Sequence, residues 1–149
     1  MEDLERSLRR HPFLEGLAPE HVRVLVGCSR NVRYRAGELI AREGDAEPHL
    51  LLLREGRLAL ETRAPGGEPI CVETLQPGDV LGVSQLTPRA AHFDCRAREA
   101  VLAFELDRDC LKRAMEADAA LGFAISSRLL ERTYERLSRI RLQNLDVYK

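Results

Sequence analysis

The chain has 149 residues, of which 44% are hydrophobic, so it can form one folded domain with a core and is not intrinsically disordered. Its 23 basic and 24 acidic residues give a net charge of −1, without the basic excess that general nucleic-acid or membrane-surface binders carry. The longest plainly apolar run, Leu50 to Leu53, is far shorter than the roughly 20 residues of a membrane helix. The start, MEDLERSLRR, is charged and lacks the pattern of a signal peptide. We therefore expect a cytoplasmic protein that makes no contact with a membrane.

The four cysteines are spread along the chain and form no CxxC pair, which disfavours a zinc knuckle or a thioredoxin-like motif. They are Cys28, Cys71, Cys95 and Cys110. Free cysteines are among the most buried residue types, and cytoplasmic thiols stay reduced. We expect buried, reduced thiols at these positions.

A helical period runs from about residue 2 to residue 28. Apolar residues recur at Leu4, Leu8, Phe13 and Leu14. In the following stretch, LAPEHVRVLVGC, Pro19 suits the first turn of a helix and Gly27 suits its end. The sequence predicts N-terminal helices over this region.

From about residue 31 to residue 106 the helical period disappears. Short apolar runs are separated by turn residues at intervals of about ten, which is typical of an antiparallel sandwich or barrel. RLALETR alternates apolar and polar residues like a half-buried strand, and the PGG at 65–67 predicts a hairpin turn after it. AVLAFEL, at 100–106, is the last expected strand.

The helical period returns at about residue 107 and continues to about 148 without a proline. Asp107 or Asp118 suits the N-cap of a helix. We therefore expect one domain over residues 1–149, in the order N-terminal helices, β-roll and C-terminal helices.

The turn signals occur in a familiar order: Gly37, then Glu43-Gly44-Asp45, then Gly56, then Gly78-Asp79. With flanking helices, this order resembles the cyclic nucleotide-binding domain of the catabolite activator and Fnr-type regulators, over roughly residues 13–148. The resemblance implies a mainly β fold with flanking helices, namely a double-stranded β-helix (jelly roll) with a long C-terminal helix.

In nucleotide-binding members of this family, the phosphate-binding loop reads roughly F-G-E-[LI]-A and then R-[ST]-A. Leu81-Gly82 matches the start, but Val83 stands at the position of the glutamate that holds the ribose. Ala91 stands at the position of the phosphate-binding arginine, and His92 follows at the Ser/Thr position. An unpaired buried polar group costs roughly 1–3 kcal/mol. The resemblance therefore implies a degenerate loop and no tight binding of cyclic AMP.

The stretch LGVSQLTPRAAHFDCRA is similar to a divergent bacterial subgroup with the pattern G-W-S-x-L-x-P-P-x-R-x-H-F-D-A-R-A. These proteins look like free-standing sensor domains, and Val83 replaces their usual tryptophan. The matching residues are Gly82, Ser84, Leu86, Pro88, Arg89, His92, Phe93, Asp94, Arg96 and Ala97. The motif does not name a ligand; the candidates are a cyclic nucleotide or another small anion, and no cofactor is indicated with certainty.

The candidate ligand-binding residues follow from this loop: Gly82, Val83, Ser84, Gln85, Arg89, Ala91, His92 and Phe93. Alternatives remain open for several of them. His92 contacts a ligand or is a satisfied polar residue between strands, and Ser84 contacts a ligand or caps a short helix. Arg89 contacts a ligand or, like Arg96, pairs with Asp94 or Glu99.

The sequence gives no sign of an enzyme or a metal site. His92 and Cys95 have an HxxC spacing, but two further ligands for a tetrahedral zinc ion are not apparent. The histidines do not form the H-x-H pair of cupin enzymes, and no catalytic triad, carboxylate pair or P-loop stands out.

The final helix has apolar and small residues at steps of three and four, which is a heptad seam. We expect Leu130, Thr133, Leu137, Ile140 and Asn144 to form a homodimer interface, as the resemblance implies, with the helix packing on the roll near Phe123. The arginines at 128, 132, 136, 139 and 141 are interpreted as a solvated face. The DNA-reading module of such regulators would follow this helix, and the sequence stops at Lys149, so we expect no direct DNA binding.

These features predict a non-enzymatic regulatory module that senses a small molecule. The alternative is a module on the same fold that binds no ligand and docks on a partner protein.

Overall fold

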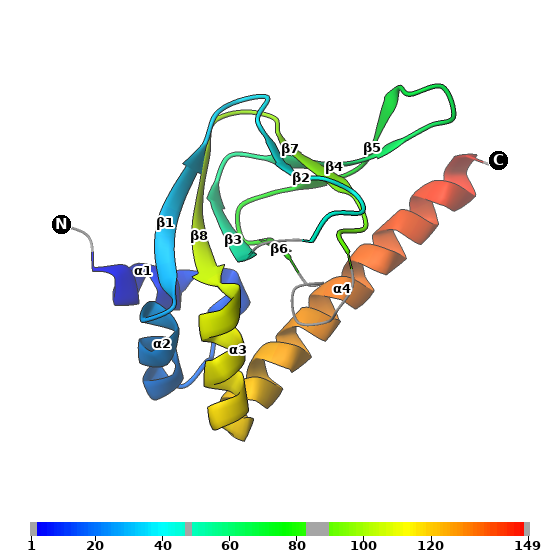
Figure 1. Cartoon of the computed structure of the whole chain (residues 1–149). Helices are drawn as coiled ribbons and strands as arrows, with labels where there is room; N and C mark the ends of the chain where they lie inside the picture. Colours follow the sequence, from blue (N-terminus) through cyan, green and yellow to red (C-terminus); the bar gives the residue numbers. More distant parts are fainter. Residues whose placement is uncertain (1–2, 47–48, 83–89, 148–149) are drawn as a thin grey trace.

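The computed structural model describes residues 3–46, 49–82 and 90–147, with the side chains of the last helix described to residue 143. Three short helical elements come first: α1 (Leu4–Arg10), the 3-10 helix η1 (Pro12–Leu14) and α2 (Pro19–Val26). Strands follow, and the chain ends in α3 (Arg108–Ala117) and α4 (Ala119–Val147) (Figure 1). The strands are β1 (Ser29–Tyr34), β2 (Leu39–Ala41), β3 (His49–Glu55), β4 (Leu58–Arg63), β5 (Pro69–Leu75), β6 (Val80–Leu81), β7 (Asp94–Ala97) and β8 (Val101–Asp107).

The strands form two antiparallel sheets that face each other. One sheet has the order β1-β8-β3-β6 and the other the order β2-β7-β4-β5. Neighbours in each sheet come from distant parts of the chain, since β1 pairs with β8 from Ser29↔Leu106 to Tyr34↔Val101. This arrangement confirms the predicted fold class, a β-roll with flanking helices and a long C-terminal helix.

Strands β3 and β8 are buried on both faces. Leu52 and Phe104 belong to the core that the sheet forms with the helices, while Leu51 and Ala103 belong to the core between the two sheets. A strand with two buried faces has no need of polar alternation. This explains why HLLLLRE and VLAFELD contain nearly continuous apolar runs.

The turn and cap predictions are confirmed. The five glycines of the family pattern have φ angles between 85° and 108°, which other residues rarely adopt. The PGG turn joins β4 to β5, with the Ala64 N–H donating to the Glu68 carbonyl at 3.1 Å. Asp107 accepts a hydrogen bond from the Cys110 N–H at 2.9 Å and Asp118 accepts one from the Ala120 N–H at 3.0 Å, so each aspartate caps a helix.

The prediction of buried, reduced thiols was wrong for three of the four cysteines. Cys28 and Cys110 form a disulfide, and Cys71 is exposed, which leaves Cys95 as the buried free thiol. The sequence separation of 82 residues hid the pairing. The two cysteines meet because the end of α2 and the start of α3 lie side by side where β1 pairs with β8.

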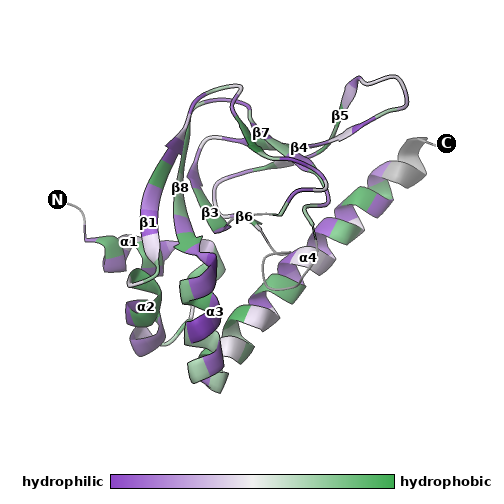
Figure 2. Ribbon diagram, viewed as in Figure 1, coloured by the Kyte–Doolittle hydropathy of each residue, from purple (hydrophilic) through white to green (hydrophobic). Residues whose placement is uncertain are grey.

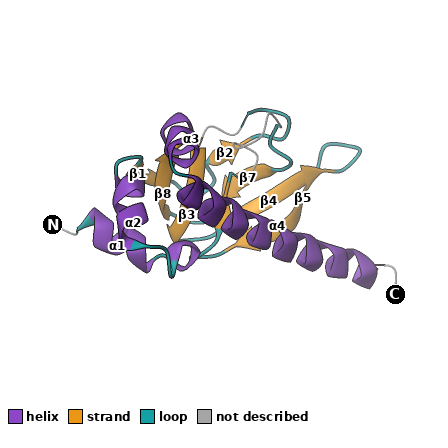
Figure 3. Cartoon of the chain, turned by 90° about the horizontal axis from the view of Figure 1, so that it is seen from below, coloured by secondary structure: helices purple, strands orange, loops and turns teal. Residues whose placement is uncertain are grey.

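Helix α4 crosses beneath the roll and extends along it (Figure 3). Leu121, Ile125 and Leu129 are buried in the core beside the helices. Phe123, which we expected to pack on the roll, is 75% exposed on the other side of the helix. Polar and apolar residues alternate along α4, and both of its sides carry apolar groups (Figure 2).

The interpretation of the α4 arginines as a solvated face was wrong for four of the five, whereas Arg141 is exposed as expected. Arg128 donates to the Glu15 carbonyl at 2.9 Å, and Arg132 donates to the Gly78 carbonyl at 2.9 Å. Arg136 and Arg139 both pair with Glu73 of β5, which is buried. At 100° per residue these arginines continue the face that Leu121 and Leu129 begin. The helix therefore rests on the roll through apolar contacts first and guanidinium contacts afterwards.

Candidate functional site

A small cavity of about 30 Å³ lies inside the roll. Apolar residues from β2, β3 and β6 form most of its wall, and three polar residues complete it. The lining residues are Tyr34, Ile40, Ala41, His49, Leu51, Leu81 and Glu105. The cavity is thus built by residues of five different strands that only the folded roll brings together.

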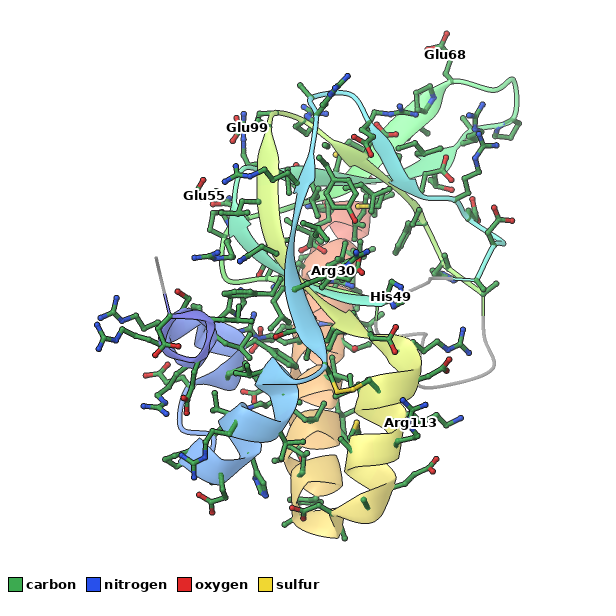
Figure 4. The ribbon with its side chains drawn as sticks, turned by 60° about the vertical axis from the view of Figure 1, so that its left-hand side comes forward. Arg30, His49, Glu55, Glu68, Glu99 and Arg113 are labelled. Atoms are coloured by element: carbon green, nitrogen blue, oxygen red, sulfur yellow. A yellow bond between two sulfur atoms is a disulfide. The ribbon has the colours of Figure 1, made fainter. Side chains whose placement is uncertain are left out.

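The polar part of the wall is centred on Glu105 of β8. Arg30 comes from β1 on one side, with its Nη2 at 2.8 Å from Glu105 Oε1, and His49 comes from β3 on the other side, with its Nε2 at 3.7 Å (Figure 4). Glu105 is buried, whereas the Arg30 side chain is largely exposed. A buried carboxylate requires a partner, and Arg30 supplies it from the rim of the cavity.

The hydrogen bonds of His49 indicate its tautomer, that is, which ring nitrogen carries the proton. Its Nδ1 accepts the Arg108 N–H at 3.2 Å, which assigns the proton of the neutral ring to Nε2. The Nε2 atom, which carries this proton, faces Glu105. His49 therefore offers a hydrogen-bond donor at the cavity wall.

Tyr34 closes the cavity on the β1 side. Burial raises the pKa of its phenol, and the negative charge of Glu105 raises that pKa further. The hydroxyl therefore stays neutral at physiological pH and can donate or accept a hydrogen bond.

Gly82 begins the segment that corresponds to the phosphate-binding loop. Its φ is +108°, and a Cβ at this position would lie 2.5 Å from the His49 carbonyl oxygen. The backbone thus approaches β3 so closely that no side chain fits. The predicted contacts Val83, Ser84, Gln85 and Arg89 lie outside the described residues.

Three further predicted site residues, Ala91, His92 and Phe93, lie just before β7. Ala91 is buried, and its backbone exchanges hydrogen bonds with the 43–45 turn: its N–H donates to the Asp45 carbonyl at 2.8 Å and its carbonyl accepts from Gly44 at 2.9 Å. Phe93 packs against the core between the sheets. The structure therefore brings this segment to the edge of the same core that contains the cavity.

His92 and Arg96 differ from the interpretations offered for them as ordinary polar residues. His92 is exposed, with its ring edge-on to Phe93 at 5.0 Å between centroids, rather than held between strands. Arg96 pairs with Glu61 of β4 at 3.3 Å and donates to the Gly37 carbonyl at 3.0 Å, not with Asp94 or Glu99. Asp94 instead accepts the Glu43 N–H at 2.7 Å. These contacts join β7 to β2 and β4 and fix the frame of the site.

Helix α4 contacts the backbone directly before Gly82. Arg136 donates to the Val80 carbonyl at 2.8 Å, and Arg132 lies 3.7 Å from the Asp79 carboxylate. The strand that leads into the loop region is therefore connected to the middle of the long helix.

Sequence reasoning missed Tyr34, His49 and Glu105. Each lies on a different strand and 15 or more positions from the others, and no local motif joins them. One signal was available, because a charged Glu105 interrupts the apolar run VLAF-E-L. A charge within a strand of that kind is unusual unless it is paired or functional.

Comparisons with known proteins identify the family of the chain. The sequence model of the cyclic nucleotide-binding domain matches residues 31–118, which is more than half of the chain. The chain belongs to the cyclic nucleotide-binding domain family.

A curated relative is the CRP-like cAMP-activated global transcriptional regulator of Mycobacterium tuberculosis, which is 26% identical over 137 residues. The match covers 91% of this chain and 59% of the relative, so the chain spans well under two thirds of the length of that regulator.

Two solved structures show the same fold. A structure described as a cyclic nucleotide-binding protein from Geobacter metallireducens has a TM-score of 0.78 and 26% identity, over 92% of this chain and 99% of that chain. The regulatory subunit of a cAMP-independent protein kinase A from Trypanosoma cruzi, bound to guanosine, has a TM-score of 0.67 and 24% identity, over 76% of this chain and 42% of that chain. The second likeness shows the fold alone.

The family is one of regulatory domains. Among the described residues, no group of three or more His, Cys, Asp or Glu side chains is placed to hold a metal ion. No helix within the described part of the chain is long and apolar enough to cross a membrane.

Proposed function

We propose that this chain is a non-enzymatic sensor module that binds a small molecule in the β-roll. The observation that carries the proposal is the cavity between β2, β3, β6 and β8, with the polar residues Tyr34, His49 and Glu105 in its wall. It lies beside Gly82, where the family keeps its ligand loop. The proposed ligand contacts are Gly82, Val83, Ser84, Gln85, Arg89, Ala91, His92 and Phe93, together with these three wall residues.

Filling this cavity requires its walls to move. A volume of about 30 Å³ equals the share of one water molecule, whereas ligand pockets usually measure ~300–1,000 Å³. The contacts of Arg132 and Arg136 join the strand before Gly82 to α4. We infer that ligand entry shifts this strand and thereby the position of α4, which is the regulatory output.

Cyclic AMP fits this site poorly. Val83 cannot accept a hydrogen bond from the ribose, and the Ala91 methyl group cannot pair with a phosphate. We expect a dissociation constant of about 100 μM or weaker, equivalent to about −5.5 kcal/mol. The trypanosomal structure with the same fold is bound to guanosine, a nucleoside without a phosphate, so nucleosides belong in the ligand panel.

The ligand is to be sought by thermal denaturation with a panel of nucleosides, cyclic nucleotides and other small anions, followed by calorimetry. A ligand at 100 times its dissociation constant stabilises the protein by about 2.7 kcal/mol, which raises the midpoint temperature of unfolding by several degrees.

Arg89→Ala and His92→Ala should abolish the rise in midpoint temperature that an anionic ligand produces. Arg98→Ala, at an exposed arginine beyond β7, is the matched control. Retention of the full shift in both site variants would place the anion site elsewhere, and sub-micromolar binding of cyclic AMP would refute the proposed loop degeneracy.

For assembly, we propose a parallel homodimer through α4 in the cytoplasm. Large apolar side chains on α4 are exposed in the single chain, with Leu130 at 71% and Leu137 at 62%. The predicted seam members Thr133 and Ile140 lie at the margin of this stripe, and the side chain of Asn144 lies outside the described residues. The cytoplasm suits a relative of transcriptional regulators. Because the family model that matches is that of a cyclic nucleotide-binding domain, we propose that this domain does not itself bind DNA.

A second candidate function is a docking module that binds no ligand and recognises a partner protein. The same exposed stripe on α4 favours it, because a large exposed apolar patch marks an interaction site. The two functions predict different results. Absence of any thermal shift across the ligand panel, combined with a monomeric protein, would favour the docking module.

A further inference from the structure

The disulfide between Cys28 and Cys110 stands apart from the proposed ligand site and is not used by it. Cys28 lies between α2 and β1, and Cys110 lies in the first turn of α3 (Figure 4). Their Cα atoms are 5.5 Å apart, within the range that a disulfide spans without movement of the backbone. The bond therefore joins the N-terminal helices to the C-terminal helices across 82 residues of sequence.

The two cysteines differ in how far each residue is exposed. Cys28 is buried, at 8% exposure, while Cys110 is only partly buried. A small thiol can thus reach Cys110 without unfolding of the core. Cys110 also lies in the first turn of α3, with its N–H donating to the Asp107 carboxylate at 2.9 Å, so the position of its backbone is fixed. Access therefore makes Cys110 the cysteine that a small thiol attacks.

The bond lies where α3 leaves the roll. Asp107 is the last residue of β8 and the N-cap of α3, and its N–H donates to the Cys28 carbonyl at 2.8 Å. Beyond this junction, α3 packs closely on α4, since a Cβ at Gly122 would lie 2.9 Å from the Met115 carbonyl oxygen. The two helices therefore pack in direct contact, which provides a route by which a change at Cys110 can affect α4.

We propose that Cys28 and Cys110 form a thiol–disulfide modification site that exchanges with low-molecular-weight thiols, and that its redox state sets how firmly α3 and α4 are held against the N-terminal helices. In a reducing compartment, protein disulfides are usually transient and redox-sensing rather than permanent. The inference does not depend on the ligand in the roll.

Reduction of the disulfide by small thiols occurs in two exchange steps. A small thiolate attacks the Cys110 sulfur, the bond to Cys28 breaks, and the Cys28 thiolate takes a proton, which leaves a mixed disulfide on Cys110. A second small thiolate attacks the sulfur of the bound small thiol, the Cys110 thiolate leaves and takes a proton, and two small thiols have become one small disulfide. In the reverse direction, the Cys110 thiolate attacks a small disulfide, and Cys28 displaces the small thiol from the mixed disulfide.

The first measurement is the thiol state of the native protein in glutathione buffers of graded redox poise, trapped by alkylation and measured by mass spectrometry. We expect Cys28 and Cys110 to change together and reversibly in the folded protein. Cys71, which is exposed and free, should be alkylated in the reduced buffers and serves as the internal reference. A bond that opens only after denaturation, or a pair that never forms a bond in oxidising buffer, would overturn the proposal.

The second measurement is hydrogen exchange of the reduced and oxidised wild-type protein. We expect amides of α3 to exchange at least ~10-fold faster after reduction, because the bond no longer restricts the local opening of this helix. The midpoint of thermal unfolding should fall by about 5–15 °C. The double variant Cys28→Ser with Cys110→Ser should reproduce the exchange rates of the reduced state. If this variant does not fold, the test is whether the exchange rates of the wild-type protein change on reduction and return on reoxidation. Equal exchange in α3 in both redox states would refute the coupling to the helices.

Discussion

At the scale of single residues, His11 connects the N-terminal helices to the roll. Its Nδ1 accepts the Phe13 N–H at 3.2 Å, and its Nε2 lies 2.8 Å from the Leu53 carbonyl oxygen, so the neutral ring donates from Nε2. Burial lowers the pKa of His11, and the positive charges of Arg132 and Arg54 lower it further against the opposing effect of the Leu53 hydrogen bond. Protonation of the ring would break a hydrogen bond, because a protonated Nδ1 could not accept the Phe13 N–H.

This predicts a pH dependence of stability. The unfolded chain protonates His11 near its ordinary pKa of 6.5, and the folded chain does so only at lower pH. The stabilisation is therefore fully present above pH 6.5 and is lost as the pH falls from there through the folded pKa. Urea denaturation between pH 5 and pH 8 should show this loss, and His11→Gln should flatten it while costing about 1–3 kcal/mol at pH 7.5.

His92→Gln is the control for that experiment, because His92 is exposed. It should keep the wild-type pH profile. An unchanged profile in His11→Gln would show that another group is responsible.

Gly82 gives a second prediction at this scale. Gly82→Ala places a methyl group 2.5 Å from the His49 carbonyl oxygen, at a φ of +108°, so both the space and the conformation oppose it. We expect a loss of about 3 kcal/mol or more in the free energy of unfolding. Gly67→Ala, at a φ of +92° with no neighbouring heavy atom within 4 Å, should lose only about 1–2 kcal/mol. Equal losses in the two variants would mean that the close approach to β3 contributes nothing.

At the scale of elements, α4 is held on the roll by a buried ion pair. Arg136 Nε lies 3.2 Å from Glu73 Oε2, and Arg139 reaches the other oxygen of the same carboxylate. Arg136 also donates to the Val80 carbonyl, so it is the residue that contacts both β5 and β6. Breaking a buried pair is costly because the remaining charge loses its partner.

Arg136→Ala should therefore destabilise the protein by about 2–4 kcal/mol, with part of the Glu73 charge still offset by Arg139. It should also accelerate limited proteolysis within α4, which a uniform loss of stability would not confine to that helix. Arg141→Ala, at an exposed arginine five residues further along, should change stability by less than about 0.5 kcal/mol. Indistinguishable unfolding curves for the two variants would contradict the anchoring role of Arg136.

At the scale of the whole molecule, the unpaired surface of α4 determines the expected assembly. Phe123, Leu130 and Leu137 recur every seven residues and are 75%, 71% and 62% exposed. They lie on the side of the helix opposite Leu121, Ile125 and Leu129, which face the core. Burying each large side chain gains about 1.5–3 kcal/mol, and a two-fold copy is the commonest partner.

We expect a dimer at micromolar concentration by light scattering, and a folded monomer for Leu130→Glu with Leu137→Glu. The control places the same two charges at exposed apolar positions outside the helix, Val24→Glu with Ile70→Glu. That variant should remain dimeric. A wild-type protein that stays monomeric at high concentration would contradict the proposed homodimer.

Many features of the fold followed from local signals, because their causes are local. The positive φ at Gly37, Gly44, Gly56, Gly78 and Gly82 reflects a backbone geometry that a short run of residues specifies. The caps at Asp107 and Asp118 likewise depend on a hydrogen bond that spans two or three residues. The alternation or continuity of apolar residues then indicated the strands, and the order of these signals indicated the family.

The candidate site was predictable only in part. The loop frame at Gly82 and Ala91 to Phe93 was visible as a motif, but the wall formed by Tyr34, His49 and Glu105 was not, because strand pairing between distant segments brings these residues together.

The same reason explains the errors about Cys28, Cys110 and the α4 arginines. The disulfide requires two chain segments 82 residues apart to meet, and the arginines bind backbone carbonyls that carry no signature in the sequence. Local chemistry thus determined the turns, the caps and the positions of the strands along the chain. Long-range packing alone decided how the strands pair and which polar side chains are buried, bonded or left facing the solvent.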